Sequence, residues 1–318
     1  PWAPPASAPD ARERRLGLAL GSGAARGWAH IGVLKVLDGA GIPLDVVCGS
    51  SVGALVGAAY ASGRMAELEA WVLGLQRLDV LRLMDPTFSG SGFIQGERLM
   101  EVFGEHVPSI AIADLPCVYA CTATDLATGA EVWIRGGDLA DAVRASIALP
   151  GLFTPVRHQD RWVVDGGLAD PVPVSLCRAL GADAVIAVNL NGGIVGKHLA
   201  KPARHAPTHA EQEGVARFLA RLRPGGGRDQ LQSFLEPSAS PRRPPGLLDV
   251  LATSINIMQD RITRSRLAGD PPEVLIMPRL RHIPVMEFHR AREAIAEGER
   301  AARQALPAVA AYVEEVAG

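Results

Sequence analysis

Short apolar runs alternate with glycine-rich turns and helix-forming segments, and this alternation restricts the fold more than any other feature of the sequence. The apolar run 16–20 ends at a glycine, a helical pattern covers residues 30–37, and a second apolar run, 46–48, ends at another glycine. Short continuous apolar runs are typical of strands in a buried sheet. The alternation therefore predicts an α/β fold with a mostly parallel central sheet and helices on its faces.

The later segments extend this pattern. We expect strands at residues 117–124, 131–134, 161–164, 184–189 and 274–277, helices at 51–61, 65–75, 97–103 and 247–265, and a final helical stretch. Over residues 192–246 the apolar periodicity fades and Pro, Gly, Arg and Ser dominate, which predicts a flexible surface insertion. We therefore expect a disordered tail over residues 1–14. One domain should cover 15–318, with its C-terminal helix–strand–helix segment packed on the core.

The overall charge is close to neutral, at -2 for the whole chain. No strong field attracts nucleic acid, so no nucleic-acid partner is expected, and a peripheral membrane contact would have to come from a local patch such as the arginines of the insertion. No apolar run reaches the ~18 residues of a membrane span, which favours a cytoplasmic protein. The four cysteines fit neither a zinc pattern nor a disulfide framework and are expected to be buried: Cys48, Cys117, Cys121 and Cys177.

The segment Gly49-Ser50-Ser51-Val52-Gly53 follows a predicted strand and precedes a predicted helix. This is the context of the G-x-S-x-G nucleophile elbow, in which a sharp turn presents the central serine. Gly49 and Gly53 would let neighbouring backbone approach closely. Ser51 is therefore the candidate nucleophile, and the alternative is an ordinary serine cap at the start of a helix.

The loop from Gly21 to Gly27 directly follows the first strand. Backbone N–H groups in such a loop can converge on an anion, and beside a nucleophilic serine they would form an oxyanion hole. The alternative is a dinucleotide-binding loop, although Arg26 stands where that motif requires glycine. Arg26 would suit an oxyanion or a phosphate, and its other interpretation is a structural ion pair.

The segment Asp165-Gly166-Gly167 follows another predicted strand. Active sites of open α/β sheets lie at the carboxyl ends of strands, so Asp165 is the candidate base, and the two glycines would leave room for substrate. The alternative is an ordinary Asp-Gly turn. Asp170 is a competing carboxylate, but Pro171 follows it, and we interpret Asp170 as a helix cap.

None of the eight histidines has the setting of a catalytic triad. This favours a Ser51–Asp165 dyad. A triad with the chain order Ser–Asp–His would need His282 or His289, and it remains an alternative. A third hypothesis is a nucleotide- or phosphate-binding regulatory module that uses the glycine loop and leaves Ser51 inert.

Four ordered segments, residues 18–34, 49–53, 145–155 and 165–167, together resemble the sequence blocks of the patatin-like phospholipase family. The likeness is greatest to bacterial members and to the related neuropathy target esterase domain, and residues 268–272 extend it. The resemblance implies a patatin-like three-layer α/β/α sandwich that hydrolyses acyl esters of lipids. Ser51 would be its nucleophile and Asp165 its base.

The resemblance also implies an oxyanion hole made by the backbone N–H groups of Gly23, Ala24 and Ala25, with Arg26 nearby. Family members usually carry more glycines where Ser22 and Ala24 stand, so the hole could differ in shape. No lid or calcium-binding segment is evident, which implies calcium independence, and we expect no metal and no cofactor. The supporting glycines of the motifs are Gly21, Gly27, Gly49, Gly53, Gly166 and Gly167.

Overall fold

The computed structural model describes residues 14–83, 97–106, 109–192 and 247–317. The predicted tail over residues 1–14 and the predicted insertion over 192–246 lie almost entirely outside these residues. Predictions about their flexibility, and about membrane contact through the insertion, therefore stay predictions.

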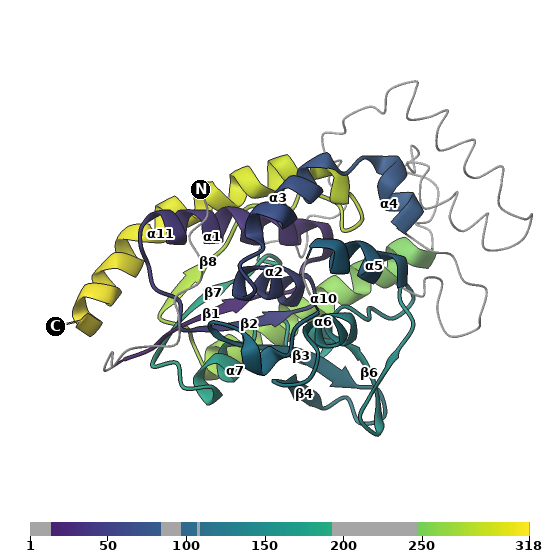
Figure 1. The fold of residues 1–318 in the computed structure, drawn as a ribbon, viewed down its shortest axis with the longest axis horizontal. Helices are drawn as coiled ribbons and strands as arrows, with labels where there is room; N and C mark the ends of the chain where they lie inside the picture. The colour runs from purple at the N-terminus through teal and green to yellow at the C-terminus, as the bar shows by residue number, and fades with distance from the viewer. Residues whose placement is uncertain (1–13, 84–96, 107–108, 193–246, 318) are drawn as a thin grey trace, which may run out of the picture.

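The centre of the molecule is an eight-stranded sheet (Figure 1). Its order is β5-β6-β3-β2-β1-β7-β8, and β4 pairs with β3 beside this path. Strands β3, β2, β1, β7 and β8 are mutually parallel, whereas β4 and β6 run antiparallel to β3, as β5 does to β6. The predicted mostly parallel sheet is confirmed. The strands are β1 (Leu16–Leu20), β2 (Val46–Ser50), β3 (Val118–Asp125), β4 (Glu131–Ile134), β5 (Val156–His158), β6 (Arg161–Asp165), β7 (Ala184–Val188) and β8 (Val274–Ile276).

Helices cover both faces of the sheet, as the sequence predicts (Figure 1). Alternate residues of β1 pack into the cores on opposite faces of the sheet, because successive side chains of a strand point to opposite faces. Leu18 and Leu20 join the larger core cluster under α1 (Ala29–Gly39), α2 (Val52–Ala61), α6 (Leu139–Ser146) and α11 (Ala291–Ala317). Ala19 joins the smaller cluster, which α7 (Val174–Ala179) and Leu267 of α10 (Leu247–Gly269) cover. The remaining helices are α3 (Met65–Gly74), α4 (Arg77–Leu83), α5 (Glu97–His106) and the 3-10 turns η1 (Ala24–Trp28), η2 (Ile112–Asp114), η3 (Gly166–Leu168) and η4 (Phe288–Arg290).

Two glycines bring the last helix against the first. A Cβ on Gly32 of α1 would lie 2.0 Å from the carbonyl oxygen of Ile295, and a Cβ on Gly298 of α11 would lie 2.0 Å from that of Ala29. The two helices therefore touch backbone to backbone, which joins the C-terminal segment to the layer beside β1.

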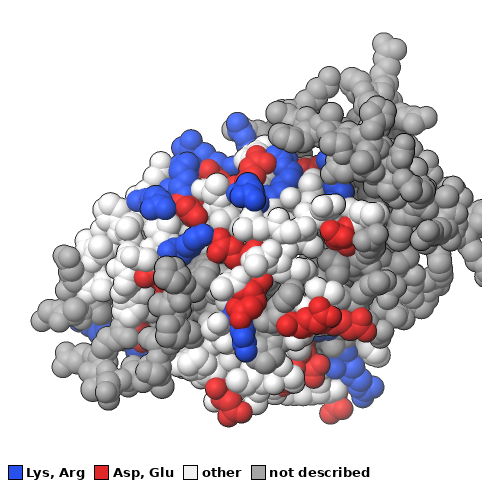
Figure 2. Space-filling model, turned by 45° about the horizontal axis from the view of Figure 1, so that its top comes forward, with Lys and Arg blue, Asp and Glu red and all other residues white. Residues whose placement is uncertain are grey.

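The visible surface carries charges of both signs. Figure 2 shows Lys and Arg interspersed with Asp and Glu on one face, with no large area of a single sign among the described residues. On α11 this pattern reflects ion pairs between neighbouring turns, including Arg300 with Glu297 at 2.6 Å and Arg303 with Glu299 at 3.2 Å. None of the described helices is both long and apolar enough to cross a lipid bilayer.

Candidate active site

Strands β2 and β6 pair with the same edge of β3, and the candidate site lies where their ends meet. Strand β2 pairs in parallel with β3 as far as Ser50, which lies opposite Thr122. Strand β6 pairs from the other direction and reaches Asp165 opposite Ala123. Strand β4 pairs with the same part of β3 and so occupies its other edge. Because β2 and β6 run toward each other, the residue after β2, Ser51, lies beside the last residue of β6.

Ser51 forms a strained turn between β2 and α2. Its backbone has φ 56° and ψ -123°, a conformation that costs a non-glycine residue roughly 1–3 kcal/mol. Neighbouring backbone leaves no room for side chains around this turn: a Cβ on Gly49 would lie 2.4 Å from Ala54, and one on Gly53 would lie 2.1 Å from the Leu20 carbonyl oxygen. The packing therefore holds Ser51 in its strained conformation.

The hydroxyl of Ser51 donates a hydrogen bond to Oδ2 of Asp165 at 2.5 Å. Oδ1 of Asp165 accepts the Gly167 N–H at 2.8 Å, so both carboxylate oxygens are occupied and the side chain is held in one orientation. Asp165 is fully buried, and this burial raises its pKa from 3.8 to about 6, although the two hydrogen bonds oppose the rise. The carboxylate is consequently a stronger base than it would be in water.

The two glycines after Asp165 serve packing within the protein. A Cβ on Gly166 would lie 2.2 Å from the Thr122 carbonyl oxygen, and one on Gly167 would lie 2.5 Å from Nε2 of Gln259. The expectation that they leave room for substrate is therefore wrong, because the groups that need this space are β3 and α10.

The amides of the glycine loop divide into engaged and free donors. The N–H of Ala25 donates to the carbonyl oxygen of Val285 at 3.0 Å. Within the described part of the chain, the N–H groups of Gly23 and Ala24 have no acceptor, and both residues line the pocket in front of Ser51. Free donors that converge on a pocket can bind an oxyanion. Two of the three predicted donors thus belong to pocket-lining residues and have no acceptor among the described residues, whereas the third, the Ala25 N–H, is bonded within the protein.

Gly21 and Gly27 allow close contacts behind the loop. A Cβ on Gly21 would lie 2.6 Å from the Val188 carbonyl oxygen, and one on Gly27 would lie 2.2 Å from the Val52 side chain. Arg26, between them in sequence, is buried and does not line the pocket. None of the described carboxylates pairs with it, so it is not the structural ion pair that the sequence left open.

Ala24 has φ 49°, the left-handed region that favours glycine. We expect Ala24→Gly to raise the free energy of unfolding by about 1 kcal/mol and the melting temperature by about 2 °C, because the Cβ strain disappears. Ala25→Gly is the matched control: Ala25 is buried and has no positive φ, so this change should be destabilising. Thermal unfolding of both variants measures the difference, and a destabilised Ala24→Gly would contradict the strain.

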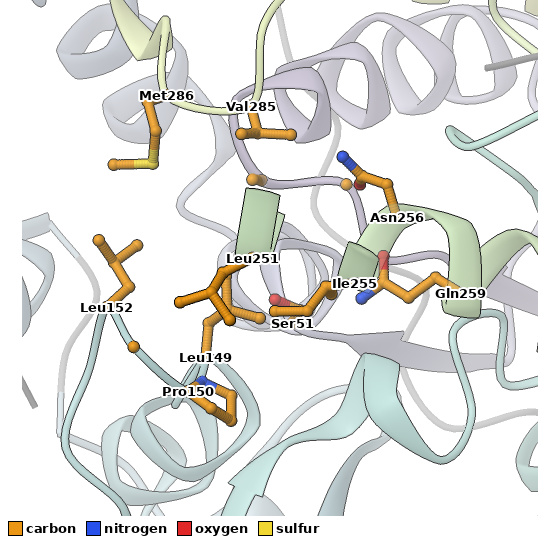
Figure 3. A pocket seen from close by; sticks show the side chains of 13 residues that line it. Ser51, Leu149, Pro150, Leu152, Leu251, Ile255, Asn256, Gln259, Val285 and Met286 are labelled. Carbon is orange, nitrogen blue, oxygen red and sulfur yellow. The ribbon is translucent and has the colours of Figure 1, made fainter. Parts of the chain in front are cut away.

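The pocket in front of Ser51 is mostly apolar (Figure 3). One wall is the segment 149–152, another is Val285 with Met286, and α10 supplies a third through side chains spaced along one helical face. None of the α10 residues was predicted as a site residue. The spacing of Leu251 and Ile255 marks a face of that helix, but nothing in the sequence directs this face to Ser51. The α10 residues that line the pocket are Leu251, Ile255, Asn256 and Gln259.

The histidines whose side chains the structure describes do not line the pocket in front of Ser51. His30 is fully buried, its Nε2 lies 2.7 Å from the Gly21 carbonyl oxygen, and burial lowers its pKa to about 4, so it supports the glycine loop as a neutral ring. His282 pairs with Glu293 at 2.8 Å, and His289 accepts a hydrogen bond from Arg77. None of these, nor His158, lines the pocket.

Asp170 does not cap a helix, contrary to the sequence-based interpretation. Helix α7 begins at Val174, four residues later, and the Asp170 carboxylate is buried 3.5 Å from Arg266. Burial and the nearby carboxylate of Glu131 raise the pKa of Asp170 to about 8. The side chain is not part of the pocket. The four cysteines are free and buried, as predicted.

The match to a known protein family covers the same motifs. The sequence model of the family described as patatin-like phospholipase matches residues 18–178, which carry the glycine loop, the elbow and Asp165. The chain belongs to the patatin-like phospholipase family. Membership makes it an ester hydrolase of the lipid-metabolising class, and its mostly parallel α/β sheet is the patatin-like fold.

The relatives match different shares of this chain. An uncharacterized NTE family protein of Mycobacterium bovis is 35% identical over 92% of each chain. Lysophospholipase NTE1 of Coccidioides immitis is 31% identical over 56% of this chain, a match to 12% of that protein. Among solved structures, VipD from Legionella pneumophila aligns with 95% of this chain and 67% of its own, with a TM-score of 0.46 and 13% identity.

Proposed function

We propose that this chain hydrolyses acyl esters of lipids with Ser51 as nucleophile and Asp165 as its base, without a histidine. The observation that carries the proposal is the 2.5 Å hydrogen bond from the strained Ser51 hydroxyl to the buried Asp165 carboxylate. A serine hydroxyl is a weak nucleophile until a base accepts its proton. Asp165 accepts a hydrogen bond from Ser51 Oγ, and its raised pKa suits it to that role at neutral pH.

In the acylation step, Ser51 Oγ attacks the ester carbonyl carbon while its proton passes to Asp165 Oδ2. The carbonyl oxygen becomes an oxyanion, which the free N–H groups of Gly23 and Ala24 would bind; the engaged Ala25 amide contributes only by holding the loop. The tetrahedral intermediate collapses, and the alcohol leaves with the proton from Asp165. A water molecule, deprotonated by the same carboxylate, then attacks the acyl-serine. The bond between the acyl carbon and Ser51 Oγ breaks, the proton passes from Asp165 to Ser51 Oγ, and the fatty acid is released.

The pocket favours a single acyl chain over a charged group beside Ser51. Its described lining has apolar side chains, two side-chain amides and no charged residue, so a phosphate would have to lie outside it. Because a fungal relative is named a lysophospholipase, we infer that the substrate class is monoacyl lipids, with the head group at the pocket mouth.

A substrate panel on the purified chain tests the proposal: a nitrophenyl butyrate, a lysophosphatidylcholine, a phosphatidylcholine and a triglyceride. Turnover of the short ester and the lysolipid is expected, with the two-chain lipids slower. Absence of turnover on every ester, together with measurable nucleotide binding, would overturn the proposal in favour of a phosphate-binding module.

The pH dependence should follow Asp165. Since only its ionised form accepts a proton, kcat/KM for an uncharged ester should rise about tenfold per pH unit up to about 6 and level off above. The inflection should hardly move with temperature, because carboxyl ionisation has a small enthalpy, whereas that of an imidazole would shift clearly. Rate profiles at two temperatures measure this, and a strongly temperature-dependent inflection would favour a histidine base.

A further inference from the structure

Arg26 is a buried cation without a buried anion. Its side chain is 1% exposed, and burial lowers its pKa to about 10, so the guanidinium keeps its charge at neutral pH. No carboxylate of the described chain pairs with it, and its Nε has no hydrogen-bond partner among the described residues. An unpaired buried charge is costly, and neutralising it with Asp or Glu would be the simple remedy. Its retention therefore calls for an explanation.

Two neutral amides stand where a carboxylate would be expected. Arg26 Nη1 donates to Oδ1 of Asn191 at 3.0 Å, and Nδ2 of Asn191 donates to Oε1 of Gln259 at 3.1 Å. Both amide groups are buried, and Nδ2 of Asn191 also contacts the Ser22 carbonyl oxygen at 3.3 Å. The carbonyl end of Asn191 thus points to the guanidinium, and the carbonyl end of Gln259 points to the amide nitrogen of Asn191. Such aligned dipoles solvate a cation without cancelling its charge.

The chain of amides joins three parts of the site. Arg26 belongs to η1, which begins with the free amide of Ala24, Asn191 follows β7, and Gln259 lies on α10 and lines the pocket (Figure 3). Leu190, next to Asn191, packs on Gly23, since a Cβ on Gly23 would lie 2.8 Å from it. The charge is therefore held next to the loop residues that line the pocket, Gly23 and Ala24.

We propose that Asn191 and Gln259 are positioning residues that hold the Arg26 guanidinium charged and unneutralised behind the oxyanion loop. The positive potential of Arg26 then stabilises the oxyanion that forms during ester attack. This inference rests on the proposed function. Preorganised charge in a water-excluded site acts mainly on the transition state, so its loss should lower kcat and leave KM nearly unchanged.

Asn191→Asp tests the inference, because it sets a carboxylate against the guanidinium in place of the amide oxygen. We expect kcat to fall at least ~10-fold with KM within about twofold. The Ki of a trifluoromethyl ketone, which forms an oxyanion on a nucleophilic serine, should rise by a similar factor. Asn189→Asp is the matched control: Asn189 Oδ1 accepts the Asn191 N–H, a role that Asp retains, and it does not contact Arg26.

A double-mutant cycle shows whether Asn191 acts through Arg26. In an Arg26→Gln background, Asn191→Asp should lower kcat less than about twofold. Arg26→Lys, which keeps the charge, should retain more turnover than Arg26→Gln, and this arm does not depend on how well Asn191→Asp folds. Equal loss in both backgrounds, or Arg26→Gln with parental kcat, would overturn the inference.

Failure of the inference and failure of the proposed function give different results. The parent protein is assayed in parallel for turnover and for covalent labelling by a fluorophosphonate. A parent that neither turns over esters nor labels contradicts the proposed function. A parent that does both, beside an Asn191→Asp variant with parental kcat and ketone Ki, contradicts only the role of the amides.

Discussion

Ser51→Ala should lower ester turnover by at least ~10⁴-fold while the protein stays folded, since loss of the nucleophile leaves only substrate binding and the oxyanion loop. Ser50→Ala is the matched control. Ser50 is fully buried, and its hydroxyl has no hydrogen-bond partner in the described structure, so its removal should leave turnover at the parental level. Steady-state rates on one short-chain ester compare the two. Parental turnover in Ser51→Ala would refute the assignment.

Ser51→Gly separates activity from stability at the same position. It removes the hydroxyl and also the Cβ that makes φ 56° unfavourable. We expect a variant that is as inactive as Ser51→Ala but more stable by about 1 kcal/mol, because glycine adopts this conformation without strain. Thermal or urea unfolding of the two variants measures the difference. Equal stability would show that the elbow stores no strain.

Asp165→Asn should lower kcat by roughly 10³–10⁴-fold, because the amide keeps the shape of the carboxylate but cannot accept the Ser51 proton. Its oxygen can still accept the Gly167 N–H, and its NH₂ can donate to Ser51 Oγ. His158→Gln, His282→Gln and His289→Gln should each retain most of the activity. A folded histidine variant as inactive as Asp165→Asn would restore the triad hypothesis.

The same substitution should stabilise the protein at neutral and alkaline pH. The folded pKa of Asp165, about 6, lies above its ordinary value of 3.8, so the folded state binds this proton more tightly than the unfolded chain. Stability from this group is therefore lost as pH rises from about 4 to 6, by roughly 3 kcal/mol in all. The neutral amide of the Asp165→Asn variant carries no such penalty. This variant should unfold later than the parent at pH 8 and at nearly the same point at pH 4, which urea unfolding at both values measures.

Ser51 and Asp165 could be predicted from the sequence because each lies in a short, recognisable motif. The glycines around Ser51 and the Asp165-Gly166-Gly167 segment each follow an apolar strand, and these patterns lie within contiguous stretches of sequence. The contact between Ser51 and Asp165 could not be predicted in the same way. It depends on β2 and β6 approaching head to head along one edge of β3, where Ser50 and Asp165 pair with adjacent β3 residues. A single sequence carries no signal for the register between distant strands. Strand β5 was not predicted either, because its three residues are too few to show a pattern.

The parts of the site contributed by distant segments escaped prediction for a related reason. The α10 helix was expected as an element, but its pocket-lining face could not be told from an ordinary packing face. The Ala25 amide was expected to be free, yet it binds Val285, which lies far along the chain. Asp170 resembled a cap because Pro171 follows it, whereas burial beside Arg266 decides its environment. In each case the deciding partner is remote in sequence.

The central claim is that Asp165 activates Ser51, and covalent labelling by a fluorophosphonate tests it most directly, since the label reports a single nucleophilic step. Intact mass and peptide mapping should give one adduct per chain, on Ser51, with none in Ser51→Ala. In Asp165→Asn the labelling rate should fall by at least ~10²-fold. Labelling of another residue, or of Ser51 at the parental rate in Asp165→Asn, would contradict the account.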